Sequence, residues 1–183
     1  MNVGTAVRAI ASAAGGRPVV FTSGGAARIA RRLADRPNHF YLDSGTGLAS
    51  SIGIGVALHA GNTTLVVDDP DGVLTNLAAL VTAGMLTDLP LVHIVLDGQP
   101  VRPASGRADL CGLAIAAGYP RTYTVDRIER LTELVRREVV SCPSPAFVRC
   151  VLSDSSSPGR ARAGRAVRTS GRRDRPPWLT EAA

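Results

Sequence analysis

The sequence contains no lysine: all 21 basic residues of its 183 are arginine. This absence excludes a P-loop lysine, a Schiff-base lysine and a lysine general base within the chain. An enzyme whose chemistry depends on such a lysine would have to obtain it from another chain.

Long apolar runs are also missing. The longest, residues 48–60, is interrupted by Ser, Gly and His and is too short to span a bilayer. Residues 1–16 lack the layout of a secretory signal. The three cysteines, Cys111, Cys142 and Cys150, are odd in number and show no CxxC spacing, which favours buried free thiols. We therefore expect a cytoplasmic protein that does not bind a membrane.

Most of the chain carries little net charge. Residues 1–157 carry 14 Arg against 13 acidic residues, a net charge of +1, whereas residues 158–183 carry 7 Arg against 2, a net charge of +5. The second segment has no apolar periodicity and is rich in Ser, Pro, Gly and Arg. We expect one domain over 1–157 and an Arg-rich, disordered tail over 158–183, with a docking arm for an acidic partner as the alternative. The nearly neutral domain does not indicate nucleic-acid binding.

Short apolar segments alternate with helical ones throughout the domain. The predicted strands are 18–22, 40–42, 64–67, 91–96, 122–125 and 146–152, and the predicted helices are 3–14, 26–33, 48–59, 73–85, 108–117 and 128–140. This alternation predicts an α/β fold with a six-stranded, mostly parallel sheet and helices on both faces. Right-handed crossovers make it doubly wound, and ligands then bind beyond the carboxyl ends of the strands. The segments expected there are 43–47, 68–72 and 97–105.

One of these segments is acidic. In LVVDDPDGVLTNLAAL (65–80), Asp68, Asp69 and Asp71 follow a strand and precede a helix. Crowded carboxylates repel one another unless a cation lies among them, and Mg²⁺ between Asp71 and a phosphate at the helix N-terminus would satisfy both. Asp97 follows the next strand and could reach the same cleft. The alternative is that Asp69 or Asp71 simply caps the helix.

A second segment is rich in glycine. FYLDSGTGLASSIGIGVAL (40–58) places Gly45, Thr46 and Gly47 between a strand and a helix, half-matching the dinucleotide-binding pattern GxGxxG. Asp68 ends the following strand, about where a ribose-binding acid is expected. An NAD-binding Rossmann protein is therefore one alternative, although it leaves Asp71 and Asp97 without a role.

The same segments resemble a known family, the diphosphate-binding half of thiamine-diphosphate-dependent enzymes. The similarity is greatest to the sulfopyruvate decarboxylase β subunit and to the C-terminal domain of phosphonopyruvate decarboxylase. Residues 40–58 are similar to that group's FY-x-x-GSMG-x-ASSIG-x-G-x-AL segment, and DDPDGVLTNLAAL to its DGDG-x-x-LMNLGAL. LVHIVLDGQP and GYPRTYTV match two later strands. The resemblance implies a thiamine-diphosphate-binding fold.

The resemblance also implies roles for individual residues. The cofactor-binding residues would be Ser44, Gly45, Thr46, Gly47, Asp71, Gly72 and Val73. The metal ligands would be Asp71, Asp97 and Gly98, the last through its carbonyl oxygen. The implied cofactors are thiamine diphosphate and Mg²⁺, and the implied reaction is decarboxylation of a small 2-oxo acid such as sulfopyruvate or phosphonopyruvate, or carboligation.

The family's activating glutamate lies on its other, pyrimidine-binding half. All four Glu of this chain fall in its last third, at Glu129, Glu133, Glu138 and Glu181. The resemblance therefore implies one subunit of a heteromer, a heterodimer or heterotetramer, whose pyrimidine-binding partner subunit supplies that glutamate.

Three positions differ from the family pattern. Pro70 stands where a Gly precedes the metal-binding Asp, Gly98 replaces a ligating Asn, and Thr46 replaces the bulky residue that props the cofactor. These differences keep open a non-catalytic structural or regulatory homologue with a degraded metal site.

Overall fold

The structure, a computed structural model, describes residues 1–98 and 108–153. Its helices are α1 (Val3–Ala14), α2 (Gly25–Leu33), α3 (Ala49–Ala60), α4 (Pro70–Thr75), α5 (Leu77–Met85), α6 (Leu110–Ala116) and α7 (Ile128–Val140). Its strands are β1 (Val19–Phe21), β2 (His39–Tyr41), β3 (Thr64–Asp68), β4 (Leu91–Gly98), β5 (Arg121–Val125) and β6 (Ala146–Leu152). Three predicted segments, 3–14, 128–140 and 146–152, have the bounds expected from the sequence.

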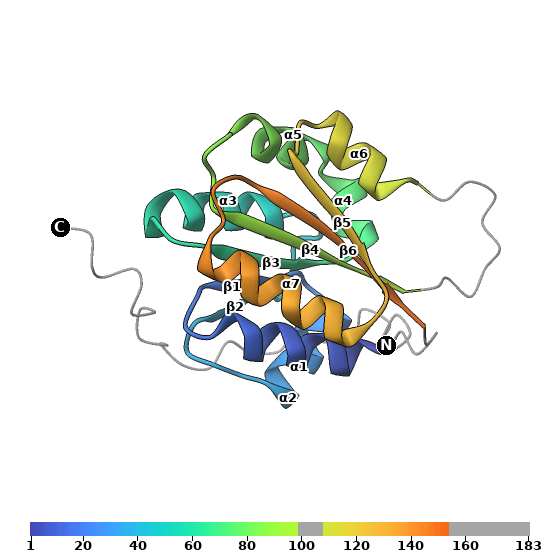
Figure 1. Cartoon of the computed structure of the whole chain (residues 1–183). Coiled ribbons are helices and arrows are strands. Elements are labelled where there is room, and N and C mark those ends of the chain that lie inside the picture. The colour runs from blue at the N-terminus through green and yellow to red at the C-terminus, as the bar shows by residue number, and fades with distance from the viewer. Residues whose placement is uncertain (99–107, 154–183) are drawn as a thin grey trace.

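The six strands form one sheet in the order β2-β1-β3-β4-β6-β5, and every pairing between neighbours is parallel. Helices cover both faces: α1, α2 and α7 lie on one, and α3, α4, α5 and α6 lie on the other (Figure 1). The predicted doubly wound α/β fold is confirmed, and the sheet is wholly rather than mostly parallel.

Two apolar cores fill the space between the sheet and these helices. Strand residues alternate between them because successive side chains point to opposite faces. On β3, Leu65 and Val67 join the core under α1 and α7, whereas Val66 joins the core under α3 and α5. Helix α3 lies very close to the sheet, since a Cβ added at Gly53 would be 2.1 Å from Val66 Cγ2.

The single helix predicted over 73–85 is wrong. The structure has two helices there, separated at Asn76, whose backbone (φ −136°, ψ 67°) is not helical. The Asn76 side-chain oxygen accepts a hydrogen bond from Ala79 N and so caps α5. An apolar pattern that continues across a helix break hides the break, because both helices bury the same face.

Cys142 and Cys150 are buried and Cys111 is half-buried, and all three are free thiols. Among the described residues, no helix has both the length and the apolar character needed to cross a membrane. The predicted domain end at 157 and the tail over 158–183 lie outside the described residues.

Candidate cofactor site

The carboxyl edge of the sheet has a switch point between β1 and β3. From β1 the chain runs outward to β2 on one side, then returns across β1 to reach β3 on the other. Crevices at such points are where open α/β sheets bind ligands. The returning segment contains Ser44 to Gly47, and the segment after β3 contains Asp69 to Gly72.

These two segments enclose a hollow of about 530 Å³, lined by Thr46, Asp69, Asp71, Leu74 and Thr75. Thr46 comes from the glycine-rich segment, and the other four residues come from α4 and its cap. The structure thus brings together two residues, Thr46 and Asp71, that the sequence placed in one site although 25 positions separate them.

Local hydrogen bonds build the acidic side of the hollow. The Asp69 carboxylate caps α4 by accepting a hydrogen bond from Gly72 N at 2.7 Å. Pro70 occupies the first turn, where no N–H is needed, so it fits the helix start without strain. Capping, which the sequence left as an alternative role, is therefore what Asp69 does. Asp71 lies in the first turn with an exposed side chain.

The carboxylates of this turn are electrostatically crowded. Burial raises the pKa of Asp69, its hydrogen bond from Gly72 N opposes that rise, and the neighbouring Asp68 and Asp71 add to it. A positive group entering the hollow would relieve this crowding, because an opposite charge nearby favours the ionised carboxyl.

The amides of Gly72 and Val73, predicted to hold a diphosphate, are already used inside the turn. Gly72 N donates to Asp69 Oδ1, and Val73 N donates to the Asp69 carbonyl oxygen at 3.2 Å. The Val73 side chain is buried in the core beneath α3 and α5. A phosphate reaching these amides would have to share them with Asp69.

Close backbone packing joins the two segments. Gly47 has φ 84°, a conformation that L side chains rarely adopt, and a Cβ there would lie 3.2 Å from the Gly72 carbonyl oxygen. Asn76 Nδ2 donates to the Gly47 carbonyl oxygen at 2.9 Å and to Ser51 Oγ at 3.2 Å. Gly45 also has a positive φ, of 90°. The glycines are therefore needed for the shape of the site.

Asp97 lies at the end of β4, on the same face of the sheet as Asp68, and is bound to an arginine. Its Oδ2 accepts a hydrogen bond from Nε of Arg149, on β6, at 2.7 Å, and Arg149 Nη2 lies 2.7 Å from the same oxygen in an ion pair. Gly98 is the last residue of β4 and pairs with Leu152. The rest of the predicted segment, 99–105, lies outside the described residues.

The predicted metal ligands do not form a compact acidic set. Within residues 1–98 and 108–153, no group of three or more His, Cys, Asp or Glu is placed to hold a metal ion. Asp71 faces the hollow, whereas Asp97 does not line it.

Three buried polar side chains beneath the turn, those of Asp68, His93 and Tyr119, lie in a row that the sequence did not indicate. Asp68 Oδ1 accepts a hydrogen bond from Asp69 N at 2.9 Å, and Asp68 Oδ2 lies 3.5 Å from His93 Nε2. The other ring nitrogen of His93 lies 3.3 Å from the Tyr119 hydroxyl oxygen. Burial, with a smaller contribution from Asp68, raises the pKa of Tyr119. Asp68 Oδ2 and His93 Nε2 are buried and form no hydrogen bond with the described residues, so the 3.5 Å contact is a close approach of two polar groups beneath the site.

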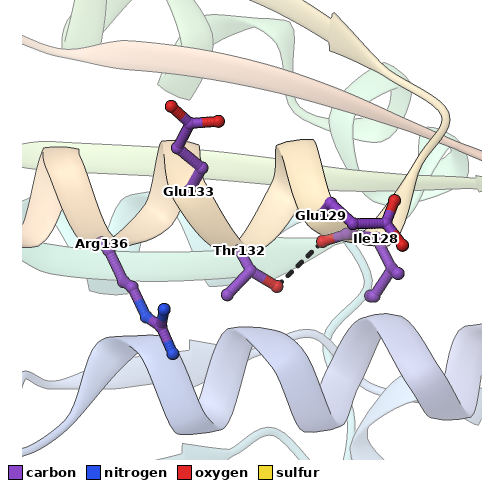
Figure 2. Close-up of a pocket in the computed structure, with 5 residues that line it drawn as sticks. All are labelled: Ile128, Glu129, Thr132, Glu133 and Arg136. Atoms are coloured by element: carbon purple, nitrogen blue, oxygen red, sulfur yellow. Dashed lines mark hydrogen bonds between the residues drawn. The ribbon is translucent and has the colours of Figure 1, made fainter.

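A second hollow, of about 460 Å³, lies along α7 and is lined by Ile128, Glu129, Thr132, Glu133 and Arg136. All five come from one helix; Thr132 Oγ1 donates to the Ile128 carbonyl oxygen, and the Arg136 side chain points toward α1 (Figure 2). Among residues 1–98 and 108–153, no second segment lines this hollow, so we place the candidate functional site at the switch point.

Comparisons with known proteins bear on the fold and the family of the chain. No family model matches the chain. Phosphonopyruvate decarboxylase of Streptomyces viridochromogenes is 33% identical over 152 residues, which cover 79% of this chain and 38% of that protein. Sulfopyruvate decarboxylase subunit beta of Methanothermobacter thermautotrophicus is 39% identical over 67 residues, 37% of this chain and 36% of that subunit. The match therefore spans little more than a third of each relative.

A solved structure from Mycobacterium smegmatis, provisionally described as a thiamin diphosphate-dependent enzyme, superposes with a TM-score of 0.70. It is 16% identical, and the match covers 84% of this chain and 32% of that one. The fold is that of thiamine-diphosphate-dependent enzymes. Within that class, the chain is a homologue of phosphonopyruvate decarboxylases and of sulfopyruvate decarboxylase β subunits, and the resemblance seen in the sequence is confirmed.

Proposed function

We propose that this chain is the diphosphate-binding subunit of a thiamine-diphosphate-dependent 2-oxo acid decarboxylase. The observation that carries the proposal is the hollow at the switch point of the sheet. Thr46 from the glycine-rich motif and Asp71 from the acidic motif both line it. The homology to phosphonopyruvate and sulfopyruvate decarboxylases supports the same chemistry.

The residues around the hollow fit the cofactor. The glycines let the two segments pack closely around the hollow, since a Cβ at Gly47 would lie 3.2 Å from the Gly72 carbonyl oxygen and a Cβ at Gly72 would lie 2.1 Å from Asp68 Oδ1. Residues 44–47 would lie beside the two rings of thiamine diphosphate, and the turn 71–73 beside its diphosphate. When bound, the cofactor supplies the electron sink for loss of CO₂ from a 2-oxo acid. The chain's own residues bind and orient it.

The fit to Mg²⁺ is incomplete. Asp71 is exposed at the hollow and offers oxygen ligands of the kind that Mg²⁺ prefers. Asp97, the second predicted side-chain ligand, is held by Arg149. We therefore propose Asp71 as the side-chain contact to the cation.

The catalytic glutamate would come from a second subunit. Every Glu that the structure describes lies on α7, which packs with α1 on the face of the sheet opposite α3. Glu138 is buried there in ion pairs with Arg121 and Arg137. We propose a pyrimidine-binding partner subunit, in a heterodimer or heterotetramer, acting on a small 2-oxo acid with an anionic substituent.

Calorimetric titration of thiamine diphosphate with Mg²⁺ tests this function. The full chain is titrated alone and after mixing with a candidate pyrimidine-binding subunit. We expect binding in the mixture, weakened roughly tenfold or more by Asp71→Asn through loss of a charged ligand. Asp88→Asn is the matched control, since Asp88 is exposed at the opposite, amino edge of the sheet, before β4.

A stable complex of the two subunits that binds no cofactor would contradict the proposal. It would favour the second candidate, a non-catalytic structural or regulatory homologue. The ion pair that removes Asp97 from the predicted metal site is the observation that favours this candidate. Unchanged binding in Asp71→Asn would leave the enzyme assignment standing and move the cation elsewhere.

A further inference from the structure

We propose that Arg149 takes the place of a divalent cation at Asp97, so that this half of the site is neutralised by the chain itself. The proposal rests on the proposed function only for the location of the site. Its evidence is the geometry of two side chains, and its test needs neither thiamine diphosphate nor a partner subunit.

The register of the sheet puts Arg149 in reach of Asp97. Asp68 of β3, Val95 of β4 and Arg149 of β6 form one row across three adjacent parallel strands. Asp97 lies two residues farther along β4, on the same face and nearer the carboxyl edge. Arg149 is thus a diagonal neighbour of Asp97, at a separation that a long side chain can bridge.

The contact is a strong one. Arg149 Nε donates a hydrogen bond to Asp97 Oδ2 over 2.7 Å, and Arg149 Nη2 forms an ion pair with the same oxygen, also at 2.7 Å. The Asp97 side chain is 7% exposed and that of Arg149 is 27% exposed, so water weakens the pair less than it would at the surface. A guanidinium remains charged throughout the physiological pH range, and charge-assisted bonds of this length are about twice as strong as neutral ones.

A metal ion at Asp97 would have to displace this arginine. Mg²⁺ requires an oxygen ligand at about 2.0–2.1 Å in near-octahedral geometry. Asp97 Oδ2 already accepts the Nε–H group of Arg149 and lies 2.7 Å from its Nη2, and a cation approaching the carboxylate is repelled by the positive charge of Arg149. Gly98 follows without a side-chain oxygen to compensate. The structure therefore assigns Asp97 to Arg149 and leaves Asp71 as the acid that faces the hollow.

Titration with Mn²⁺ alone, followed by the electron paramagnetic resonance of the free ion, tests the assignment in the full chain. We expect Asp97→Asn to leave the Mn²⁺ affinity of the chain within about twofold, because Asp97 does not meet the ion. We expect Arg149→Gln to raise the affinity about tenfold or more, because it removes the positive charge that lies against Asp97 Oδ2 and repels the ion. The double variant Arg149→Gln with Asp97→Asn should lose that gain.

Arg127→Gln is the matched control for the removal of one positive charge. It removes the partner of Glu129 in an ion pair of 3.7 Å, but both side chains are exposed, and they lie at the N-cap and in the first turn of α7, on the other face of the sheet. We expect no change in Mn²⁺ affinity. An equal gain in this variant would show a general charge effect and would overturn the proposal.

Two other results would overturn the proposal. One is a roughly tenfold loss of Mn²⁺ affinity in Asp97→Asn with Arg149 present; the other is no gain in a folded Arg149→Gln protein. If Arg149→Gln does not fold, the proposal is tested in the wild-type chain instead. The Arg149 Nε–H signal in its nuclear magnetic resonance spectrum then shows whether the ion displaces the arginine. We expect that signal to stay in place when Mg²⁺ is added to excess, and a shift would mean that the ion displaces the arginine.

Discussion

Asn76 Nδ2 donates a hydrogen bond to the carbonyl oxygen of Gly47 over 2.9 Å, and this bond ties the two segments of the site together. It joins the break between α4 and α5 to the loop that crosses from β2 to α3. The same side chain caps α5 through its oxygen. One residue thus fixes both the helix break and the distance across the hollow.

Substitutions at Asn76 should separate these two tasks. Asn76→Asp keeps an oxygen for Ala79 N but loses the donors to Gly47 and Ser51, so we expect it to lower the free energy of unfolding by about 1–2 kcal/mol. Asn76→Ala should cost about 1 kcal/mol more, because the cap is lost too. Urea unfolding measures both. Thr82→Ala, which removes a hydroxyl bonded within α5, should change stability by less than about 0.5 kcal/mol.

Two glycines of α3 should respond in opposite directions to alanine. Gly53→Ala places a methyl 2.1 Å from Val66 Cγ2, and we expect it to lower the free energy of unfolding by about 1–3 kcal/mol. At Gly55 nothing lies within 4 Å of the added carbon, so Gly55→Ala should stabilise the helix by about 0.5–1 kcal/mol. Thermal unfolding checks both. If Val66→Ala does not reduce the cost of Gly53→Ala, the close contact is not its cause.

Stability should fall on acidification because of His39. Burial, helped by Arg36 and opposed by Asp35, lowers the pKa of His39 to about 4. The unfolded chain, with a histidine pKa near 6.5, then binds more protons between about pH 6.5 and 4, so acid favours unfolding. We expect wild type to lose up to about 3 kcal/mol relative to His39→Gln over this range. His59→Gln, at an exposed position of α3, should follow wild type; parallel curves for wild type and His39→Gln would contradict the assignment.

Glu138 should be a major contributor to stability. Its side chain is 1% exposed and accepts hydrogen bonds from Arg121 Nη1 and, at 3.0 Å, from Arg137 Nη2. Glu138→Gln leaves Arg121 without its charged partner, so we expect a loss of about 2 kcal/mol or more in urea unfolding. Glu133→Gln, on the exposed face of the same helix, should cost less than about 0.5 kcal/mol. Equal effects of the two variants would show that burial of the ion pair is not what matters.

Most of the fold was predictable because each strand is short, apolar and bounded by a helix. The period of apolar residues located 3–14 and 128–140 without error, since amphipathic helices with one buried face carry a clear signal. The break at Asn76 was not predictable in this way. It depends on a hydrogen bond to Gly47, 29 residues away, and a contact of that kind leaves no local pattern.

The sequence predicted that Thr46 and Asp71 would lie close together at the carboxyl edge of the sheet, and in the structure both line one hollow there. It could not show that Asp97 would be bound by Arg149, because their meeting depends on β6 lying next to β4. Nor could it indicate that the side chains of Asp68, His93 and Tyr119 lie in a row, because this requires three segments to come together in the core. Apolar periodicity encodes which residues are buried, but not the side-chain pairs that form across strands.

The position of β6 between β4 and β5 constrains the order in which the sheet can be completed during synthesis. Within the part of the chain that the structure describes, strand β5 pairs with β6 alone. Because β6 is made later, β5 leaves the ribosome before this hydrogen-bonding neighbour exists. Strands β1 to β4 can associate earlier, because each adjoins one already made. Arg149 arrives with β6, so Asp97 acquires this arginine only at the last step of assembly. A nascent chain that stalls before residue 146 therefore exposes the unpaired edge of β4.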